Sequence, residues 1–223
     1  MKILNNYQIK TLQAISQTRL AEDYYWTGGA ALAYKYLPIR LSTDLDFFSF
    51  DLETDENLLI ELNKIKKALN IKKIDFTEHL NRRQIILEFN KKNKLKLEFV
   101  FFPFRNLDKL VVDKNFNIKI NSLADIATNK TLAVYQRDEQ KDIFDLYCLL
   151  KNKNLNLNKL IKNVNKKFGI KIEQADLQAK ILNNINLLED IKLLIINKKN
   201  FNINEIKFFF SIKSVKYLNN FIW

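Results

Sequence analysis

Hydrophobic and polar positions follow different periods in the two halves of this 223-residue chain. Apolar residues recur every three or four positions where we expect helices, and they alternate or form short runs where we expect strands. The first half predicts helices over 3–22, from Ala30 to near Pro38 and over 56–69, and strands over 24–26, 45–50, 71–77, 84–90, 94–102 and around Val111 and Ile118. The second half predicts only helices, over 123–135, 139–151, 157–167, 174–197 and 203–221.

These elements predict an α+β protein with two lobes around a cleft. Residues 1–121 would form an α/β core, and residues 122–223 a helical lobe. The turn-type cluster Asn90-Lys91-Lys92-Asn93 separates two alternating runs, which indicates a β-hairpin.

Candidate chemistry is concentrated early in the chain. Gly28-Gly29 precedes a helical run, and a turn of this kind offers backbone N–H groups to an anion at a helix start. Asp44 and Asp46 follow in an Arg-x-Ser-x-Asp-x-Asp sequence, and side chains two apart on a strand share a face. Two such carboxylates repel unless a cation neutralises them, and Mg²⁺ binds one or two carboxylates together with substrate phosphates.

Taken singly, Gly-Gly is usually a plain turn, and D-x-D arises by chance on many surface strands. Together, with Arg40 and Ser42 between them, the two motifs resemble the nucleotidyltransferase fold of the DNA polymerase β superfamily. In particular the chain resembles the AbiEii/AbiGii family, whose pattern is G-G-T-A-L-A and then R-x-S-x-D-x-D-[FL]. Ala30 replaces the usual Thr. The resemblance implies a mixed sheet with flanking helices, followed by the helical lobe.

The second half contains three more candidate residues. Lys130 lies on the core-facing edge of its predicted helix, where a snorkelling surface lysine is the structural alternative. Asp142 and Asp145 share one helix face, and their repulsion could instead be relieved at the surface by Lys141. The stretch from Ser122 to Lys130 and the segment 137–146 match the family's S-x-x-[DE]-x-x-x-x-K and [KR]-x-x-x-K-D-x-x-D-[LI] patterns. By resemblance, Lys130 would hold a nucleotide triphosphate, and the two aspartates would support the active site.

The resemblance also implies a third metal-binding carboxylate, on a strand antiparallel to that of Asp44 and Asp46. Glu98 is the best candidate because it lies mid-strand among apolar neighbours, where an unpaired carboxylate is costly. Glu88 on the preceding strand is the fallback. Mg²⁺ or Mn²⁺ would then bind Asp44, Asp46 and Glu98, while Gly28-Gly29, Ser42 and Arg40 would contact the phosphates of an NTP.

Composition narrows the possible classes. The single cysteine, Cys148, excludes an internal disulfide, and the single histidine, His79, gives no basis for a histidine triad or zinc site. No apolar run reaches the ~20 residues of a transmembrane helix, and the N-terminus lacks a signal-peptide pattern. We therefore expect a cytoplasmic protein with no membrane partner.

The net charge of +12 is uneven. Residues 1–104 carry 16 basic and 13 acidic side chains, residues 105–150 carry 7 of each, and residues 151–223 carry 14 and 5. Such a basic lobe is typical of polyanion binding, although a Lys-, Asn- and Ile-rich composition also reflects AT-rich coding.

The resemblance implies a toxin that transfers NMP from an NTP to RNA, tRNA 3′ ends in particular, and so arrests growth. A cognate antitoxin would restrain it, with or without stable contact. Two alternatives stay open. A small-molecule nucleotidyltransferase of the antibiotic-modifying kind would need an acidic pocket, which the basic lobe argues against. An inactive nucleotide- or RNA-binding module is disfavoured by the intact motif residues.

Overall fold

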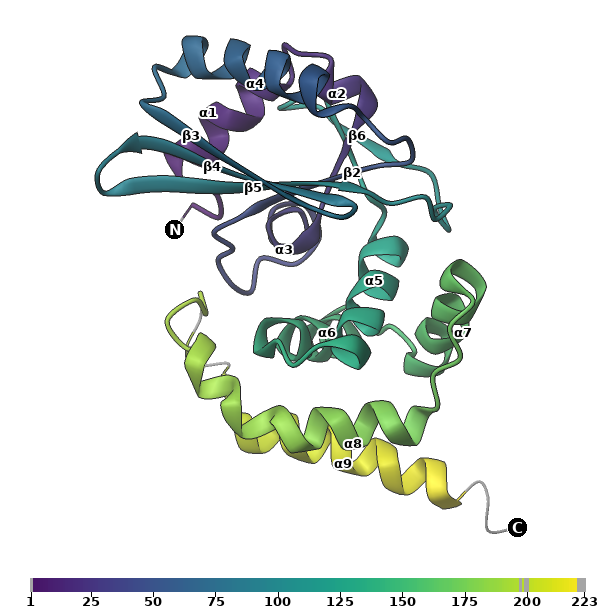
Figure 1. Ribbon diagram of the computed structural model, residues 1–223. Coiled ribbons are helices and arrows are strands. Elements are labelled where there is room, and N and C mark those ends of the chain that lie inside the picture. Colours follow the sequence, from purple (N-terminus) through teal and green to yellow (C-terminus); the bar gives the residue numbers. More distant parts are fainter. Residues whose placement is uncertain (1, 197, 199–200, 220–223) are drawn as a thin grey trace. The chain divides into compact units, whose positions relative to one another are not determined.

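The computed structural model describes residues 2–196, 198 and 201–219. The chain divides into two compact units, Met1–Leu123 and Ala124–Trp223, and each is described here by itself. The first unit contains a seven-stranded sheet, and the described part of the second is helical (Figure 1). No helix of the described residues is long and apolar enough to cross a membrane.

The first unit contains the elements that the hydrophobic pattern predicts. Its helices are α1 (Asn6–Ile15), α2 (Leu20–Asp23), α3 (Gly28–Ala31), its π-helical continuation η1 (Leu32–Tyr36) and α4 (Asp55–Leu69). Its strands are β1 (Tyr25–Thr27), β2 (Leu45–Ser49), β3 (Lys73–His79), β4 (Arg82–Asn90), β5 (Asn93–Phe101), β6 (Val111–Asp113) and β7 (Ile118–Ile120). The predicted strands and the hairpin between β4 and β5 are confirmed, with ends that shift by a residue or two.

The predicted first helix over 3–22 is wrong in its length. A capping box between Asn5 and Gln8 begins α1, which ends at Ile15. Just beyond it, the hydroxyls of Ser16 and Thr18 donate to carbonyls three residues earlier, at 2.8 Å and 2.7 Å. Such side-chain bonds compete with the helical backbone ladder, so the chain turns before the short helix α2.

The sheet has the strand order β3-β4-β5-β2-β1-β7-β6. It is mixed, as expected, because β2 pairs with β5 in parallel and β1 pairs with β7 in parallel, while the other pairs are antiparallel. Helix α4 lies over one face, and α3 lies on the other side of the strands (Figure 1). On β2, Leu45 and Phe47 are buried, whereas the alternate residues Asp46 and Phe48 are half-exposed on the opposite face.

The second unit is built from five α-helices and one 3₁₀ segment in its described part. These are α5 (Leu123–Gln136), α6 (Gln140–Asn152), α7 (Leu157–Phe168), α8 (Gln174–Asn184), η2 (Ile185–Ile191) and α9 (Ile203–Asn219). The single helix predicted over 174–197 is wrong. It ends after Asn183-Asn184, two residues with low helix propensity, and tightens into the 3₁₀ segment. Residue 197 of that prediction, and residues 220 and 221 of the last predicted helix, lie outside the described residues.

Candidate active site

The Gly28-Gly29 turn is built so that only glycine fits. Gly28 follows β1 with φ at +74°, and a Cβ placed on it would lie 1.8 Å from Oδ2 of Asp46. A Cβ on Gly29 would lie 2.8 Å from Nη2 of Arg40 and 3.0 Å from Oγ of Ser42. Five predicted site residues therefore meet at this turn, with the backbone of the glycines directly against a carboxylate, a guanidinium and a hydroxyl.

The loop that carries Arg40 and Ser42 is fixed from two sides. The Arg40 side chain is buried and donates from Nη1 to the carbonyl of Leu41 at 2.9 Å. Gln8 on α1 is also buried, and its Nε2 donates to the carbonyl of Ser42 at 2.8 Å. Helix α1 thus holds the segment between the glycine turn and β2 in place.

The carboxylates of the sheet form a row across neighbouring strands. Asp46 on β2 is the register partner of Thr27 on β1 and of Glu98 on β5, so these side chains share a face. We expected the strand of Glu98 to be antiparallel to β2, and this orientation is wrong because β5 runs parallel to it. Glu88 lies four residues beyond Gln84, the β4 partner of Glu98, and its carboxylate pairs with Lys94 at 3.0 Å. The fallback residue is therefore remote from Asp46.

A lysine connects two of the predicted metal ligands. Nζ of Lys96 lies 2.9 Å from Oδ2 of Asp44 and 3.0 Å from Oε1 of Glu98. Burial lowers the pKa of Lys96, but its hydrogen bonds to both carboxylates outweigh this effect, so the pKa is raised above its usual value of 10.5. Nη1 of Arg82 on β4 lies 3.3 Å from Oε2, the other carboxylate oxygen of Glu98. Asp44 and Glu98 thus converge on one cationic position.

This donor set is the kind that a hard divalent ion takes. Oxygen ligands from one or two carboxylates suit Mg²⁺, and Asp44 and Glu98 already share a cation through Lys96. Among the residues that the structure describes, no three acidic, histidine or cysteine side chains are arranged as a ready-made metal cage. A metal ion here would need the Lys96 ammonium to move aside.

The second unit contains Lys130, Asp142 and Asp145 as one buried cluster. Nζ of Lys130 on α5 lies 2.6 Å from Oδ1 of Asp142 and 2.7 Å from Oδ2 of Asp145, both on α6. Arg137 contacts the other oxygen of Asp142 at 2.7 Å through both Nε and Nη2. Lys141, the surface alternative, instead lies 3.9 Å from Glu139. The buried ammonium of Lys130 and the half-exposed guanidinium of Arg137 together neutralise the two carboxylates, which allows the aspartates to be buried.

A second buried ion pair lies nearby in the same unit. Nζ of Lys167 on α7 lies 2.6 Å from Oδ1 of Asp125 on α5, and both side chains are 0% exposed. Burial lowers the pKa of Lys167, and the bond to Asp125 opposes this shift. The pair fixes α7 against α5, so we assign it a structural role.

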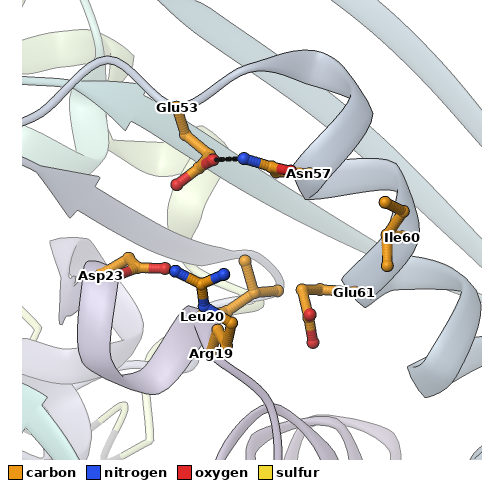
Figure 2. Close-up of a pocket in the computed structure, with 7 residues that line it drawn as sticks. All are labelled: Arg19, Leu20, Asp23, Glu53, Asn57, Ile60 and Glu61. Atoms are coloured by element: carbon orange, nitrogen blue, oxygen red, sulfur yellow. Dashed lines mark hydrogen bonds between the residues drawn. The ribbon is translucent and has the colours of Figure 1, made fainter.

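Another pocket in the first unit has the wrong chemistry for a nucleotide. It measures about 120 Å³ and is lined by α2, α4 and their flanking residues: Arg19, Leu20, Asp23, Glu53, Asn57, Ile60 and Glu61 (Figure 2). Burial raises the pKa of Asp23, and the charge of Glu53 raises it further. The carboxylates of Asp23 and Glu53 lie beside one arginine, while that of Glu61 pairs with Lys64, so triphosphate would be repelled.

Three site residues were missed in the sequence: Lys96, Arg82 and Gln8. Lys96 was within reach of sequence reasoning, because it lies two residues before Glu98 on the same strand and therefore on the same face. Arg82 and Gln8 join the site through strand pairing and helix packing, for which the sequence carries no local signal.

The comparisons with known proteins identify the family and the fold. The sequence model of the nucleotidyl transferase AbiEii toxin family, of type IV toxin–antitoxin systems, matches residues 10–212. An uncharacterized protein of Aquifex aeolicus, aq_aa25, is 29% identical over 170 residues, which are 75% of this chain and 77% of the relative.

Two solved structures share the fold across nearly the whole chain. A putative nucleotidyltransferase from Helicobacter pylori has a TM-score of 0.61 at 19% identity, with 97% of each chain covered. The structure of JHP933 from Helicobacter pylori has a TM-score of 0.59 at 19% identity, with 95% of this chain and 93% of that chain covered.

Family match and fold together define a nucleotidyltransferase with a mixed seven-stranded sheet, flanking helices and C-terminal helices. The chain belongs to the AbiEii nucleotidyltransferase toxin family, and its chemistry is the transfer of a nucleotide from an NTP.

Proposed function

We propose that this protein is a divalent-metal-dependent toxin that adds NMP to an RNA acceptor, with tRNA 3′ ends as the expected target. The observation that carries the proposal is the contact between the Gly28 backbone and the Asp46 carboxylate, whose register partner is Glu98. This contact supports the proposal because the backbone turn, which we propose binds phosphate, lies beside the carboxylates of Asp46 and Glu98. Family membership supports nucleotidyl transfer, and the excess of basic residues over 151–223 supports a polyanionic acceptor.

Each residue of the first unit has a distinct proposed task. The backbone N–H groups of Gly28-Gly29 and the hydroxyl of Ser42 would bind phosphate oxygens, and Arg40 would neutralise their charge. Asp44, Asp46 and Glu98 would hold Mg²⁺ or Mn²⁺. A bound divalent ion would supply charge stabilisation at the α-phosphate and for the departing pyrophosphate.

The transfer of NMP needs only the NTP and the acceptor hydroxyl as reactants. The oxygen of an acceptor hydroxyl forms a bond to the α-phosphorus, the bond from that phosphorus to the β-phosphate oxygen breaks, and pyrophosphate leaves. The proton of the hydroxyl passes to Asp46 or Glu98, the carboxylates on the reacting face.

The roles of Lys130, Asp142 and Asp145 stay predictions from the family resemblance. Within the second unit, the two aspartates fix the position of the Lys130 ammonium, and the Lys130 side chain is 10% exposed. We propose that Lys130 binds the triphosphate and that Asp142 and Asp145 orient it. The cognate antitoxin and a cytoplasmic location belong to this proposal as well.

A labelling assay tests the proposal. Purified protein, Mg²⁺, each α-labelled NTP in turn and total tRNA should give labelled RNA with wild type and none with Asp46→Asn. Asp75→Asn is the matched control, because the Asp75 side chain on β3 is 42% exposed and pairs only with Lys73 among the ion pairs described. If wild type and Asp46→Asn label RNA equally, or if label enters small molecules and never RNA, the proposal fails.

A further inference from the structure

Aromatic side chains lie directly beside the carboxylate row of the first unit. On the face that carries Asp46, the next cross-strand row consists of Tyr25 on β1, Phe48 on β2, Val100 on β5 and Arg82 on β4, each a register partner of its neighbour. Two residues along a strand span about 7 Å, so this row begins about 7 Å from that of Asp46.

The rings in this row form a connected cluster that reaches the surface. Phe50 follows β2, and its ring centroid lies 5.3 Å from that of Tyr25, which in turn lies 6.1 Å from that of Phe48. Phe102, just past β5, packs on Phe48 at 4.5 Å. Phe50 is 41% exposed, and Phe48 is half-buried. We call Tyr25, Phe48 and Phe50 the aromatic platform.

The order of groups along β2 indicates which part of the reaction this platform serves. Ser42 and Gly29 lie together on one side of Asp46, and Phe48 and Phe50 follow it on the other side. In an in-line displacement the attacking and leaving oxygens lie on opposite sides of the α-phosphorus. If the departing phosphates occupy the glycine turn, the attacking hydroxyl approaches from the aromatic side.

The platform also has the chemistry of a single-stranded nucleic-acid site. Nucleobases stack on aromatic rings without sequence preference, and a nearby cation contacts the backbone. Arg82 supplies that cation, because its side chain is 46% exposed and lies in the same row as Phe48.

We propose that Tyr25, Phe48 and Phe50 stack the unpaired 3′-terminal base of the RNA acceptor and so present its terminal hydroxyl to the α-phosphate. This inference rests on the proposed function, because it identifies the part of the acceptor that enters the same site. Phe50 is the outermost ring and makes the stacking contact, while Phe48 and Tyr25 support it.

A fluorescence titration tests the platform without requiring any transfer. The probe is a short single-stranded oligoribonucleotide with 2-aminopurine as its 3′-terminal base, whose emission is quenched when the base stacks. Wild type should quench the probe, and Phe50→Ala should bind it at least about fivefold more weakly and with less quenching, as expected for one lost base–aromatic stack. Phe50→Trp should restore both, whereas Phe50→Leu, which is apolar without a comparable ring face, should not.

Controls separate this inference from the proposed function. Ile60→Ala removes an apolar side chain that is 55% exposed on α4, outside both the platform and the basic region 151–223, and should leave the titration unchanged. If Phe50→Ala binds and quenches the probe like wild type, the platform is refuted, whether or not wild type labels RNA. If wild type never labels RNA while Phe50-dependent quenching persists, the transfer proposal fails and the stacking site stands.

Discussion

Replacing Gly28 with alanine tests the geometry of the glycine turn. The added Cβ would lie 1.8 Å from Oδ2 and 2.6 Å from Cγ of Asp46. Non-bonded carbon atoms rest about 3.5–4.0 Å apart, so the carboxylate must move by more than about 1 Å. A displacement of about 1 Å at a reacting centre can reduce the rate about 100-fold, and we expect a loss of at least that size.

Gly169→Ala is a matched control for Gly28→Ala. Gly169 ends α7 with φ at +68°, close to the +74° of Gly28, and nothing lies within 4 Å of its hypothetical Cβ. The left-handed alanine alone should cost both variants about 1–2 kcal/mol of stability, and Gly28→Ala should lose more because of its clash with Asp46. Only Gly28→Ala should also lose NMP transfer, measured as the initial rate of label incorporation at saturating NTP. Equal rates in the two variants, both near wild type or both abolished, would refute the role of the turn.

Three further predictions follow from ion pairs. Lys96→Met removes the ammonium shared by Asp44 and Glu98, and should tighten Mn²⁺ binding by up to about fivefold in calorimetry, since exposed pairs contribute up to about 1 kcal/mol; unchanged affinity would contradict this. Lys130→Met leaves the α6 carboxylates buried without their shared ammonium, so the free energy of unfolding measured in urea should fall by about 3–5 kcal/mol. A fall of less than about 1 kcal/mol would contradict this prediction. Lys151 lowers the pKa of Glu205 below its usual 4.5, so this carboxylate stabilises the fold above that pH and less as pH falls through the lowered value. Glu205→Gln should therefore flatten the acid limb of stability, and an unchanged limb would argue against the pair.

Local patterns in the sequence predicted those parts of the site that depend on residues close together in the chain. The spacing of Asp142 and Asp145 predicted that both lie on one side of α6, where both contact Lys130. The alternation around β2 predicted one face for Asp44 and Asp46, but β2 begins at Leu45, so for Asp44 this stays a prediction. In each case a single strand or helix sets the geometry, so no knowledge of its neighbours is required.

Relationships between distant elements could not be obtained in this way. The prediction that Glu98 lies mid-strand is confirmed, but its strand β5 runs parallel to β2. Strand β5 lies between β4 and β2, and this order is a property of the whole sheet. The same holds for Lys130, whose position on α5 gave no indication that two aspartates of α6 would neutralise it. Pairing of this kind depends on long-range packing that one-dimensional periodicity does not contain.

The mass of the acceptor RNA tests the central claim most directly. A purified tRNA incubated with the protein, Mg²⁺ and unlabelled NTPs should gain the mass of one or more nucleotide residues at its 3′ end, with one pyrophosphate released for each. Asp46→Asn should leave the mass unchanged. If the RNA mass never changes with wild type, or if it changes equally with Asp46→Asn, then the carboxylate row on β2 and β5 is not an RNA nucleotidyl-transfer centre.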